Sequence, residues 1–239
     1  MLWNTNVRKS RIIFIYLCVM KVIISGYGKM GRMVEAKLKE RGIEIAACSE
    51  DICSTPPELA RECVCIDFTT PDAFRANYKF IAANFKAAVV GTTGWYDIKD
   101  SVFGEFKKSG CTLIWSANFS IGVNALFAAV EKASAILKDH GYTPDISETH
   151  HIHKLDKPSG TAKVLGNIVA DNLGVEAPIE SFREGEVPGI HTVEFLSNFD
   201  RLSFTHEAFS REGFAEGAVA AAMLSEGLSD IHEFKNLII

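Results

Sequence analysis

The stretch of sequence that decides the fold is MKVIISGYGKMGRMVEAKLKERG, residues 20–42. Its apolar start, Lys21–Ser25, predicts a buried strand, and the helical spacing of apolar residues in Met30–Arg41 predicts a helix that stops at Gly42. Between them lies a G-x-G-x-x-G run, which in a strand–turn–helix context is typical of a dinucleotide-binding loop. The first glycine permits a tight turn, the second lets the backbone approach a pyrophosphate, and the third lets helix and strand pack closely. The predicted cofactor-binding residues of this loop are Gly26, Tyr27, Gly28, Lys29, Met30 and Gly31.

The alternation of strand and helix continues to about residue 118. The predicted strands are Ile43–Cys48, Cys63–Phe68, Ala87–Val90 and Thr112–Trp115, and the predicted helices are Pro71–Phe85 and Asp97–Lys108. Short apolar runs without polar alternation are typical of parallel strands buried on both faces. This part of the chain is therefore predicted to form an α/β domain with a doubly wound, Rossmann-like parallel sheet.

The regular alternation of strand and helix ends after Asn118, and several of the predicted strands that follow have no helix between them. The predicted helices are Ile121–His140, Thr161–Leu173 and Ala215–Leu228, and the predicted strands are Asp145–His150, Glu180–Glu184, His191–Leu196 and Arg201–His206. This order predicts an α+β domain with an open mixed sheet. We expect a dinucleotide-binding domain from residues 20–118 and 212–239, and a substrate-binding and oligomerisation domain from residues 119–211. We expect residues 1–19 to be a non-structural extension.

Further cofactor contacts are predicted at the carboxyl ends of other strands, because ligands of open α/β sheets bind there. An acidic residue about 20 residues after the glycine loop commonly binds the ribose hydroxyls. Glu50 and Asp51 occupy that place, and no Arg or Lys stands beside them before Arg61, so we predict a preference for NADH over NADPH. The other predicted cofactor residues are Gly91, Thr92, Thr93, Ser116, Ala117, Asn118 and Phe119.

The densest polar segment is ETHHIHKLDKPSGT, residues 148–161, with three of the seven histidines. A metal site, a solvated loop and an acid–base site are all possible for such a segment. No matching carboxylate or cysteine set accompanies the histidines, so we predict no metal. Histidine exchanges protons near neutral pH, and a helix start with hydroxyls and free N–H groups suits a carboxylate. Acid–base chemistry on a small carboxylate is therefore favoured, with Ser159, Gly160 and Thr161 at the helix start and His151 and Lys154 as nearby cations.

Composition excludes some partners and places. The net charge of −5 argues against nucleic acid, whose binders usually carry a basic face. The apolar run Ile12–Met20 is too short to cross a bilayer, which takes about 20 residues, so no membrane partner is expected. None of the six cysteines forms a C-x-x-C pair, and most lie in apolar runs, which favours a reducing compartment, the cytoplasm.

Residues 150–162, HHIHKLDKPSGTA, resemble the signature of 4-hydroxy-tetrahydrodipicolinate reductases, also called dihydrodipicolinate reductases. Similar segments follow the family order: 26–31, 67–69, 91–94, 117–120, 122–124 and 183–191. The resemblance spans Met20 to about Leu228. It implies a two-domain enzyme, usually a homotetramer joined through the sheets of its second domains. It also implies hydride transfer from NADH or NADPH to a cyclic dicarboxylate in lysine and diaminopimelate biosynthesis.

Carried over by position, the resemblance makes His150 a proton donor and acceptor and Lys154 a proton donor. It implies that His151, Lys154, Ser159, Gly160 and Thr161 hold the substrate carboxylates. Three features depart from the family pattern: Lys157 replaces an alanine, the segment between Ile52 and Cys63 is short, and Asp51 stands where some members have a basic residue.

Two other functions stay open from the residues themselves. One is a different NAD(P)-dependent amino-acid or hydroxy-acid dehydrogenase, against which the PSGT segment and its histidines argue. The other is a dinucleotide-sensing module without catalysis, which would keep the glycine loop but would not need His150 or Lys154.

Overall fold

The computed structural model describes residues 20–238, so the predicted extension at residues 1–19 lies outside the described part. The chain forms two compact units. Among the described residues, the first comprises residues 20–119 together with Ala215–Ile238, and the second is Ser120–Phe214. The assignment of the cofactor to the first unit and of the substrate to the second stays a prediction.

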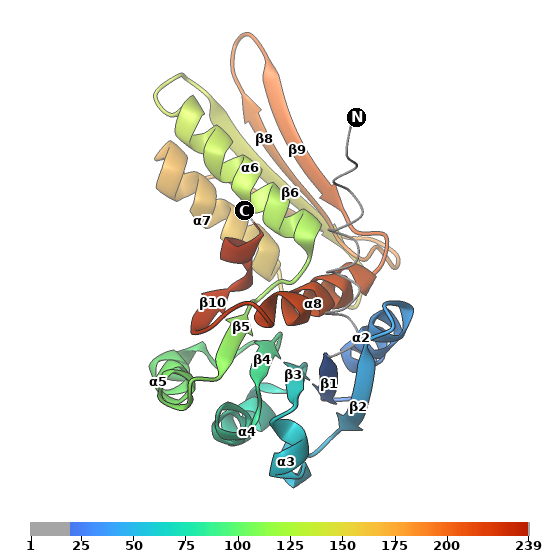
Figure 1. The fold of residues 1–239 in the computed structure, drawn as a ribbon. Helices are drawn as coiled ribbons and strands as arrows, with labels where there is room; N and C mark the ends of the chain where they lie inside the picture. The colour runs from blue at the N-terminus through green and yellow to red at the C-terminus, as the bar shows by residue number, and fades with distance from the viewer. Residues whose placement is uncertain (1–19, 239) are drawn as a thin grey trace, which may run out of the picture. The chain divides into compact units, whose positions relative to one another are not determined.

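The first unit contains a six-stranded parallel sheet with the order β10-β5-β4-β3-β1-β2 (Figure 1). Its strands are β1 (Lys21–Ser25), β2 (Glu44–Ser49), β3 (Cys63–Asp67), β4 (Ala87–Val90), β5 (Thr112–Trp115) and β10 (Ile231–Glu233). Its helices are α2 (Lys29–Glu40), α3 (Pro57–Ala60), α4 (Pro71–Asn84), α5 (Lys99–Ser109) and α8 (Glu212–Ser225), the last belonging here from Ala215 onward. Short 3-10 turns are η1 (Ile52–Ser54), η2 (Tyr96–Ile98) and η3 (Phe234–Leu237). The predicted doubly wound sheet is confirmed.

Helices cover both faces of this sheet. Alternate residues of a strand point to opposite faces, so each strand packs against helices on both sides. Val22 and Ile24 of β1 lie in one apolar cluster with Leu38 of α2 and the alanines of α8. Ile23, between them, lies in a second cluster with Phe74 of α4 and with α5. All three β1 residues are fully buried, because the strand lies between helices on both faces of the sheet. This explains why its sequence shows no alternation of apolar and polar residues.

The second unit contains a four-stranded mixed sheet with the order β7-β6-β8-β9. Its strands are β6 (Thr143–His150), β7 (Ile179–Arg183), β8 (Ile190–Leu196) and β9 (Arg201–Glu207), and its helices are α6 (Ile121–Leu137) and α7 (Gly160–Leu173). β6 runs parallel to β7 and antiparallel to β8, and β8 runs antiparallel to β9. The predicted open mixed sheet is therefore confirmed.

Both α6 and α7 lie on one face of the second sheet (Figure 1). Val193 and Phe195 of β8 pack beneath them, while the alternate residue Thr192 faces the other way and lies 3.0 Å, oxygen to oxygen, from Thr205. The predicted alternation of β8 is confirmed by its burial. Within residues 20–238, no helix is both long and apolar enough to cross a membrane.

Several element boundaries differ from the predictions by one to three residues, and two short elements, α3 and β10, were not predicted. The helix expected to reach His140 ends at Leu137, because Lys138 leaves the helical conformation and Asp139 adopts a left-handed one with φ of 63°. β10 was not predicted, since its three residues are too few to show a pattern. β6 begins at Thr143 rather than Asp145.

Candidate active site

The glycine loop lies where the strand order of the first sheet reverses, between β1 and its neighbours β2 and β3. Gly26 has φ of 87°, and a side chain there would come within 2.5 Å of the Phe68 carbonyl oxygen. A side chain at Gly31 would come within 2.1 Å of the Gly26 carbonyl oxygen. Gly28 begins α2 without a side-chain cap, and a Cβ there would meet nothing within 4 Å. The loop thus combines two enforced close contacts with one open approach to a helix start, which is the geometry that a pyrophosphate requires.

A buried carboxylate joins the strand ends around this loop. Asp67, the last residue of β3, accepts hydrogen bonds from Ser25 Oγ at 2.7 Å, Thr92 Oγ1 at 2.6 Å and Thr69 Oγ1 at 3.0 Å. Burial raises its pKa, and these hydrogen bonds offset part of that effect. The Thr92 hydroxyl also accepts from the Thr69 N–H at 2.7 Å. Asp67 therefore fixes the ends of three strands, and the sequence alone gave it no role.

Several predicted cofactor residues have structural contacts of their own. The Tyr27 hydroxyl donates to Glu35, and the Arg32 guanidinium lies 4.7 Å from the centre of the Tyr27 ring. Lys29 is the first residue of α2 and Met30 packs partly into the core. Of the two acidic residues after β2, Asp51 caps η1 by accepting from Cys53 N–H, whereas Glu50 is exposed.

The loop after β5 is closed by its own side chains. The Ser116 hydroxyl donates to the Asn118 carbonyl at 2.7 Å and accepts from the Asn118 N–H at 3.1 Å. Phe119 is 2% exposed and its ring packs against Phe68 and Phe234. A cofactor contact from Phe119 would therefore use its backbone.

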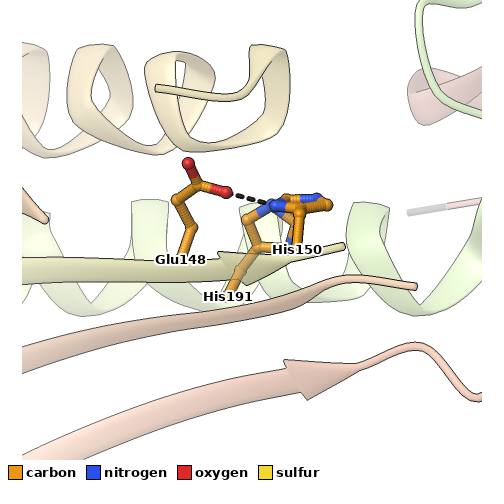
Figure 2. A group of neighbouring side chains, drawn as sticks. All are labelled: Glu148, His150 and His191. Carbon is orange, nitrogen blue, oxygen red and sulfur yellow. Dashed lines mark hydrogen bonds and ion pairs between the residues drawn. The ribbon is translucent and has the colours of Figure 1, made fainter. Parts of the chain in front are cut away.

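The polar segment of the second unit begins with two buried side chains on β6. Glu148 and His150 are two residues apart on a strand, so both point to the face that α6 and α7 cover. The carboxylate of Glu148 contacts Nδ1 of His150, as Figure 2 shows. Glu148 is 1% exposed and His150 is 7% exposed.

The second oxygen of the Glu148 carboxylate is also occupied. Arg183, at the end of β7, donates to Oε1 at 3.1 Å, and the Ser159 N–H donates to the same oxygen at 3.3 Å. Burial alone would raise the pKa of Glu148, but the hydrogen bonds that it accepts bring that pKa below its ordinary value. Burial lowers the pKa of His150, against the opposing effect of Glu148. The pair is thus an ionised carboxylate beside a neutral imidazole at neutral pH.

His191 of β8 joins this pair from the neighbouring strand (Figure 2). Its ring lies edge-on to that of His150, with 5.0 Å between ring centres, and its Nε2 lies 3.2 Å from Ser159 Oγ. Burial, with smaller contributions from its charged neighbours, lowers the pKa of His191 to about 4. A neutral His191 therefore contacts both His150 and Ser159, the residue just before α7.

The start of α7 is arranged as predicted from its sequence. Ser159 caps the helix, accepting from the Ala162 N–H at 3.2 Å, and Gly160 and Thr161 form its first turn. A Cβ at Gly160 would meet nothing within 4 Å. The helix start therefore has room for an anion beside Gly160.

The basic side chains of the segment lie on the loop between β6 and α7. Lys154 Nζ pairs with Asp156 at 2.7 Å, and the His151 Nε2 accepts from Arg211 at 3.3 Å. His153 lies 3.2 Å from the exposed Glu186, which leaves it outside the buried group. Lys154 still acts electrostatically on His150 and lowers its pKa.

The ligand atoms of Glu148, His150 and His191 lie within 4.8 Å of one another, close enough to share a metal ion. The Glu148 carboxylate is already bonded by Arg183, His150 and the Ser159 N–H, so hydrogen bonding accounts for its burial without an ion. The expectation of no metal stays a prediction.

Comparison with known families identifies this arrangement. Residues 20–119 match the family model of the dihydrodipicolinate reductase N-terminus, and residues 122–237 match that of its C-terminus. The chain belongs to the dihydrodipicolinate reductase family. It is accordingly an oxidoreductase of the NAD(P)H-dependent kind, with a nicotinamide dinucleotide as its cofactor.

Individual relatives agree with the family. A 4-hydroxy-tetrahydrodipicolinate reductase of Christiangramia forsetii is 36% identical over 92% of this chain and 98% of its own length. Its counterpart from Ralstonia nicotianae is 31% identical over 92% of this chain and 99% of its own length. A solved structure of a dipicolinate-bound dihydrodipicolinate reductase from Paenisporosarcina sp. TG-14 has a TM-score of 0.78 and 20% identity, covering 92% of this chain and 99% of that one. At that identity the match concerns the fold.

Sequence reasoning assigned no role to three residues of the buried group, Glu148, Arg183 and His191. Glu148 carries a usable signal, since its two-residue spacing from His150 places both on one face of a strand. Arg183 and His191 lie in the family-like segment 183–191, but no local pattern links them to this group, because they reach Glu148 and His150 only through the pairing of β6 with β7 and β8.

Proposed function

We propose that this chain reduces 4-hydroxy-tetrahydrodipicolinate to tetrahydrodipicolinate with a hydride from NADH or NADPH, in lysine and diaminopimelate biosynthesis. The names of its relatives support the reaction, and one observation supports the placement of its chemistry. That observation is the buried Glu148–His150 pair beside the start of α7. It sets a proton-exchanging imidazole next to a site suited to a carboxylate.

The residues of the second unit divide into two roles in this proposal. His150 and Lys154 exchange protons with the substrate, Lys154 as the donor. His151, Lys154, Ser159, Gly160 and Thr161 hold its carboxylates. The room beside Gly160 and the hydroxyl cap at Ser159 support the second role, because N–H groups at a helix start bind anions.

The glycine loop of the first unit fits a dinucleotide. Its backbone is unobstructed at Gly28, and the start of α2 there offers N–H groups for a pyrophosphate. When bound, the nicotinamide supplies the hydride. Gly91–Thr93 and Ser116–Phe119 line its site in this proposal, and the exposed Glu50 binds the ribose hydroxyls. That acidic side chain would repel a 2′-phosphate, so we propose a preference for NADH.

A coupled assay tests the reaction. Dihydrodipicolinate synthase generates the substrate in place, and the purified chain is expected to oxidise NADH only while the synthase is active. Omitting the synthase is the control. Tight NADH binding without turnover would instead support a sensing module, and turnover with an unrelated amino acid or hydroxy acid would support another dehydrogenase. A lower KM for NADPH than for NADH would contradict the proposed cofactor preference.

We propose that the chain assembles as a homotetramer through the sheet face that α6 and α7 leave uncovered. This face presents hydroxyl and carboxylate groups, including Ser203, which donates to Glu194 at 2.7 Å. Light scattering on the purified chain measures the mass, and a monomeric mass would contradict the assembly.

We also propose a cytoplasmic location, supported by the free thiols of the buried Cys63, Cys65 and Cys111.

A further inference from the structure

We infer that Glu148 is the positioning residue of His150. Its carboxylate accepts a hydrogen bond from the Nδ1–H group of His150 and thereby leaves Nε2 as the nitrogen that exchanges protons. The inference rests on the proposed function, in which His150 exchanges protons with the substrate. It adds a residue, a tautomer and a reacting atom to that function.

Burial of Glu148 has a cost in free energy. An ionised carboxylate taken out of water is unfavourable unless hydrogen bonds replace its hydration. Ile146, two residues earlier on the same face of β6, packs in the apolar core, and Glu148 takes the next inward position. A carboxylate at this position therefore needs a function or a partner, and the structure gives it His150.

Each oxygen of the Glu148 carboxylate has its own partners. Oε1 receives Nη1 of Arg183 and the Ser159 N–H, while Oε2 faces Nδ1 of His150. An ionised carboxylate only accepts hydrogen bonds, so a neutral His150 must carry its proton on Nδ1. Nε2 is then the basic nitrogen of the ring.

The other edge of the His150 ring lies beside Gly189. A Cβ at Gly189 would come within 3.0 Å of His150 Nε2, and Gly189 has φ of 156°. A glycine at this position therefore keeps a side chain away from Nε2. Glu148 and Gly189 thus act on opposite edges of one imidazole, one engaging Nδ1 and the other clearing Nε2.

Other charged groups face His150 as well. Arg183 comes from β7 and Lys154 from the loop between β6 and α7, and both lower the pKa of His150. His191 lies on β8 and is neutral at neutral pH. Glu148 opposes the two cations, which makes it the group whose removal would move the titration of His150 to lower pH.

The substitution Glu148→Gln tests the inference sharply. Arg183 and the Ser159 N–H both donate to the Oε1 position, so the amide oxygen of glutamine should occupy it. The amide NH2 then faces Nδ1 and can only donate, which forces the His150 proton to Nε2. A comparable exchange of tautomer in a Ser-His-Asp triad lowers kcat by about 10⁴-fold. General acid–base catalysis contributes about 10²–10⁴-fold, so we expect kcat to fall on the order of 10²-fold with KM nearly unchanged.

Three measurements separate positioning from a merely structural role. Nitrogen NMR of labelled histidine should show Nδ1 protonated in the wild type and Nε2 protonated in E148Q. The inflection of the pH profile that H150Q removes should move to lower pH in E148Q. In an H150Q background, E148Q should cause no further loss of kcat, because Glu148 would act only through His150.

Matched variants serve as controls. Glu186 contacts His153 on the surface, so Glu186→Gln makes the same chemical change in an exposed pair and should leave kcat unchanged. Glu148→Asp keeps the charge on a shorter side chain and should retain the wild-type tautomer and more activity than E148Q. NADH affinity and the melting temperature identify any variant that fails to fold.

An unchanged His150 tautomer in E148Q, or losses of kcat that multiply in the double variant, would overturn the inference. Absence of wild-type turnover would contradict the proposed function instead. The NMR result does not depend on turnover, so the two failures are distinguishable.

Discussion

Arg183 allows the most detailed prediction about stability. Its guanidinium donates to Glu148 Oε1 at 3.1 Å, to the Phe182 carbonyl at 2.6 Å, to the Lys154 carbonyl at 3.2 Å and to the Asp156 carbonyl at 2.6 Å. In the ion pair, the side chains of Arg183 and Glu148 are 16% and 0% exposed. The substitution Arg183→Met keeps much of the side-chain volume but leaves a buried carboxylate without its cation.

Breaking one partner of a buried pair costs about 3–5 kcal/mol, because the remaining charge is uncompensated. For chains of this size, about 1 kcal/mol corresponds to a change in melting temperature of roughly 2–4 °C. R183M should therefore melt roughly 6–12 °C below the wild type if the loss is about 3 kcal/mol. The double variant R183M/E148Q should recover part of this loss, since no unpaired charge remains.

The pH dependence gives the prediction a sign. The pKa of Glu148 lies below the ordinary value of 4.5, so its ionised form contributes stability above pH 4.5 that is lost as the pH falls through the folded pKa. Removing Arg183 penalises the ionised form and raises that pKa. The difference in melting temperature between R183M and wild type should be largest near neutral pH and should shrink on acidification.

Thermal unfolding followed by circular dichroism across pH 4–7 measures both effects. An R183M protein that melts within about 1 °C of the wild type at neutral pH would refute the reasoning, since about 3 kcal/mol cannot produce so small a shift. A difference that grows toward acid pH would refute the assigned ionisation of Glu148.

Three further predictions use the same protein. Gly31→Ala should lower both NADH affinity and thermal stability, because its Cβ would lie 2.1 Å from the Gly26 carbonyl oxygen; the matched Gly104→Ala in α5, where a Cβ meets nothing within 4 Å, should leave NADH affinity unchanged in titration calorimetry. His191→Asn should reduce the rise of the unfolding free energy with pH, between about pH 4 and 6.5, by up to about 1.4 kcal/mol per pH unit. The native imidazole, with its pKa lowered to about 4, stays neutral in that range while the imidazole of the unfolded chain is protonated. Denaturant titrations at several pH values that give the same dependence of unfolding free energy on pH for both proteins would contradict this. Lys154→Met should lower kcat about 10²-fold or more but change the unfolding free energy by less than about 1 kcal/mol, since the ion pair of Lys154 with the exposed Asp156 contributes little. A steady-state assay measures the first effect and a melting curve the second, and a variant with the wild-type kcat would contradict the proton-transfer role of Lys154.

Local sequence predicted much of this fold because strong periodicity and glycine turns report local structure. Lys21–Ser25, the glycine loop and α2 follow from one stretch of sequence, and the buried faces of Val22 and Ile23 agree with a doubly wound sheet. The end of α6 did not follow, since no residue before Gly141 marks the change of backbone conformation at Lys138 and Asp139. The strand β10 is held by its pairing with β5, which no local pattern reveals.

The chemical site divides in the same way. His150, Lys154 and the start of α7 belong to one segment and could be predicted together. Arg183 lies opposite His150 only because β6 and β7 pair in parallel, and His191 lies opposite Glu148 only because β8 pairs antiparallel. Tertiary pairing therefore supplies the groups that satisfy the buried carboxylate.

In the β6–α7–β7 unit, the buried Glu148–His150 pair lies far from the connection between α7 and β7. His150 and Arg183 pair at one end of the two parallel strands, whereas Ile146 pairs with Ile179 at the other. Residues 174–178, which connect α7 to β7, therefore lie at the end of the strands remote from the buried Glu148–His150 pair. A short peptide tag or a fluorescent label inserted there would be carried by the enzyme without contact with the buried Glu148–His150 pair. This connection is thus the natural attachment point for immobilising the protein or for following it in single-molecule experiments.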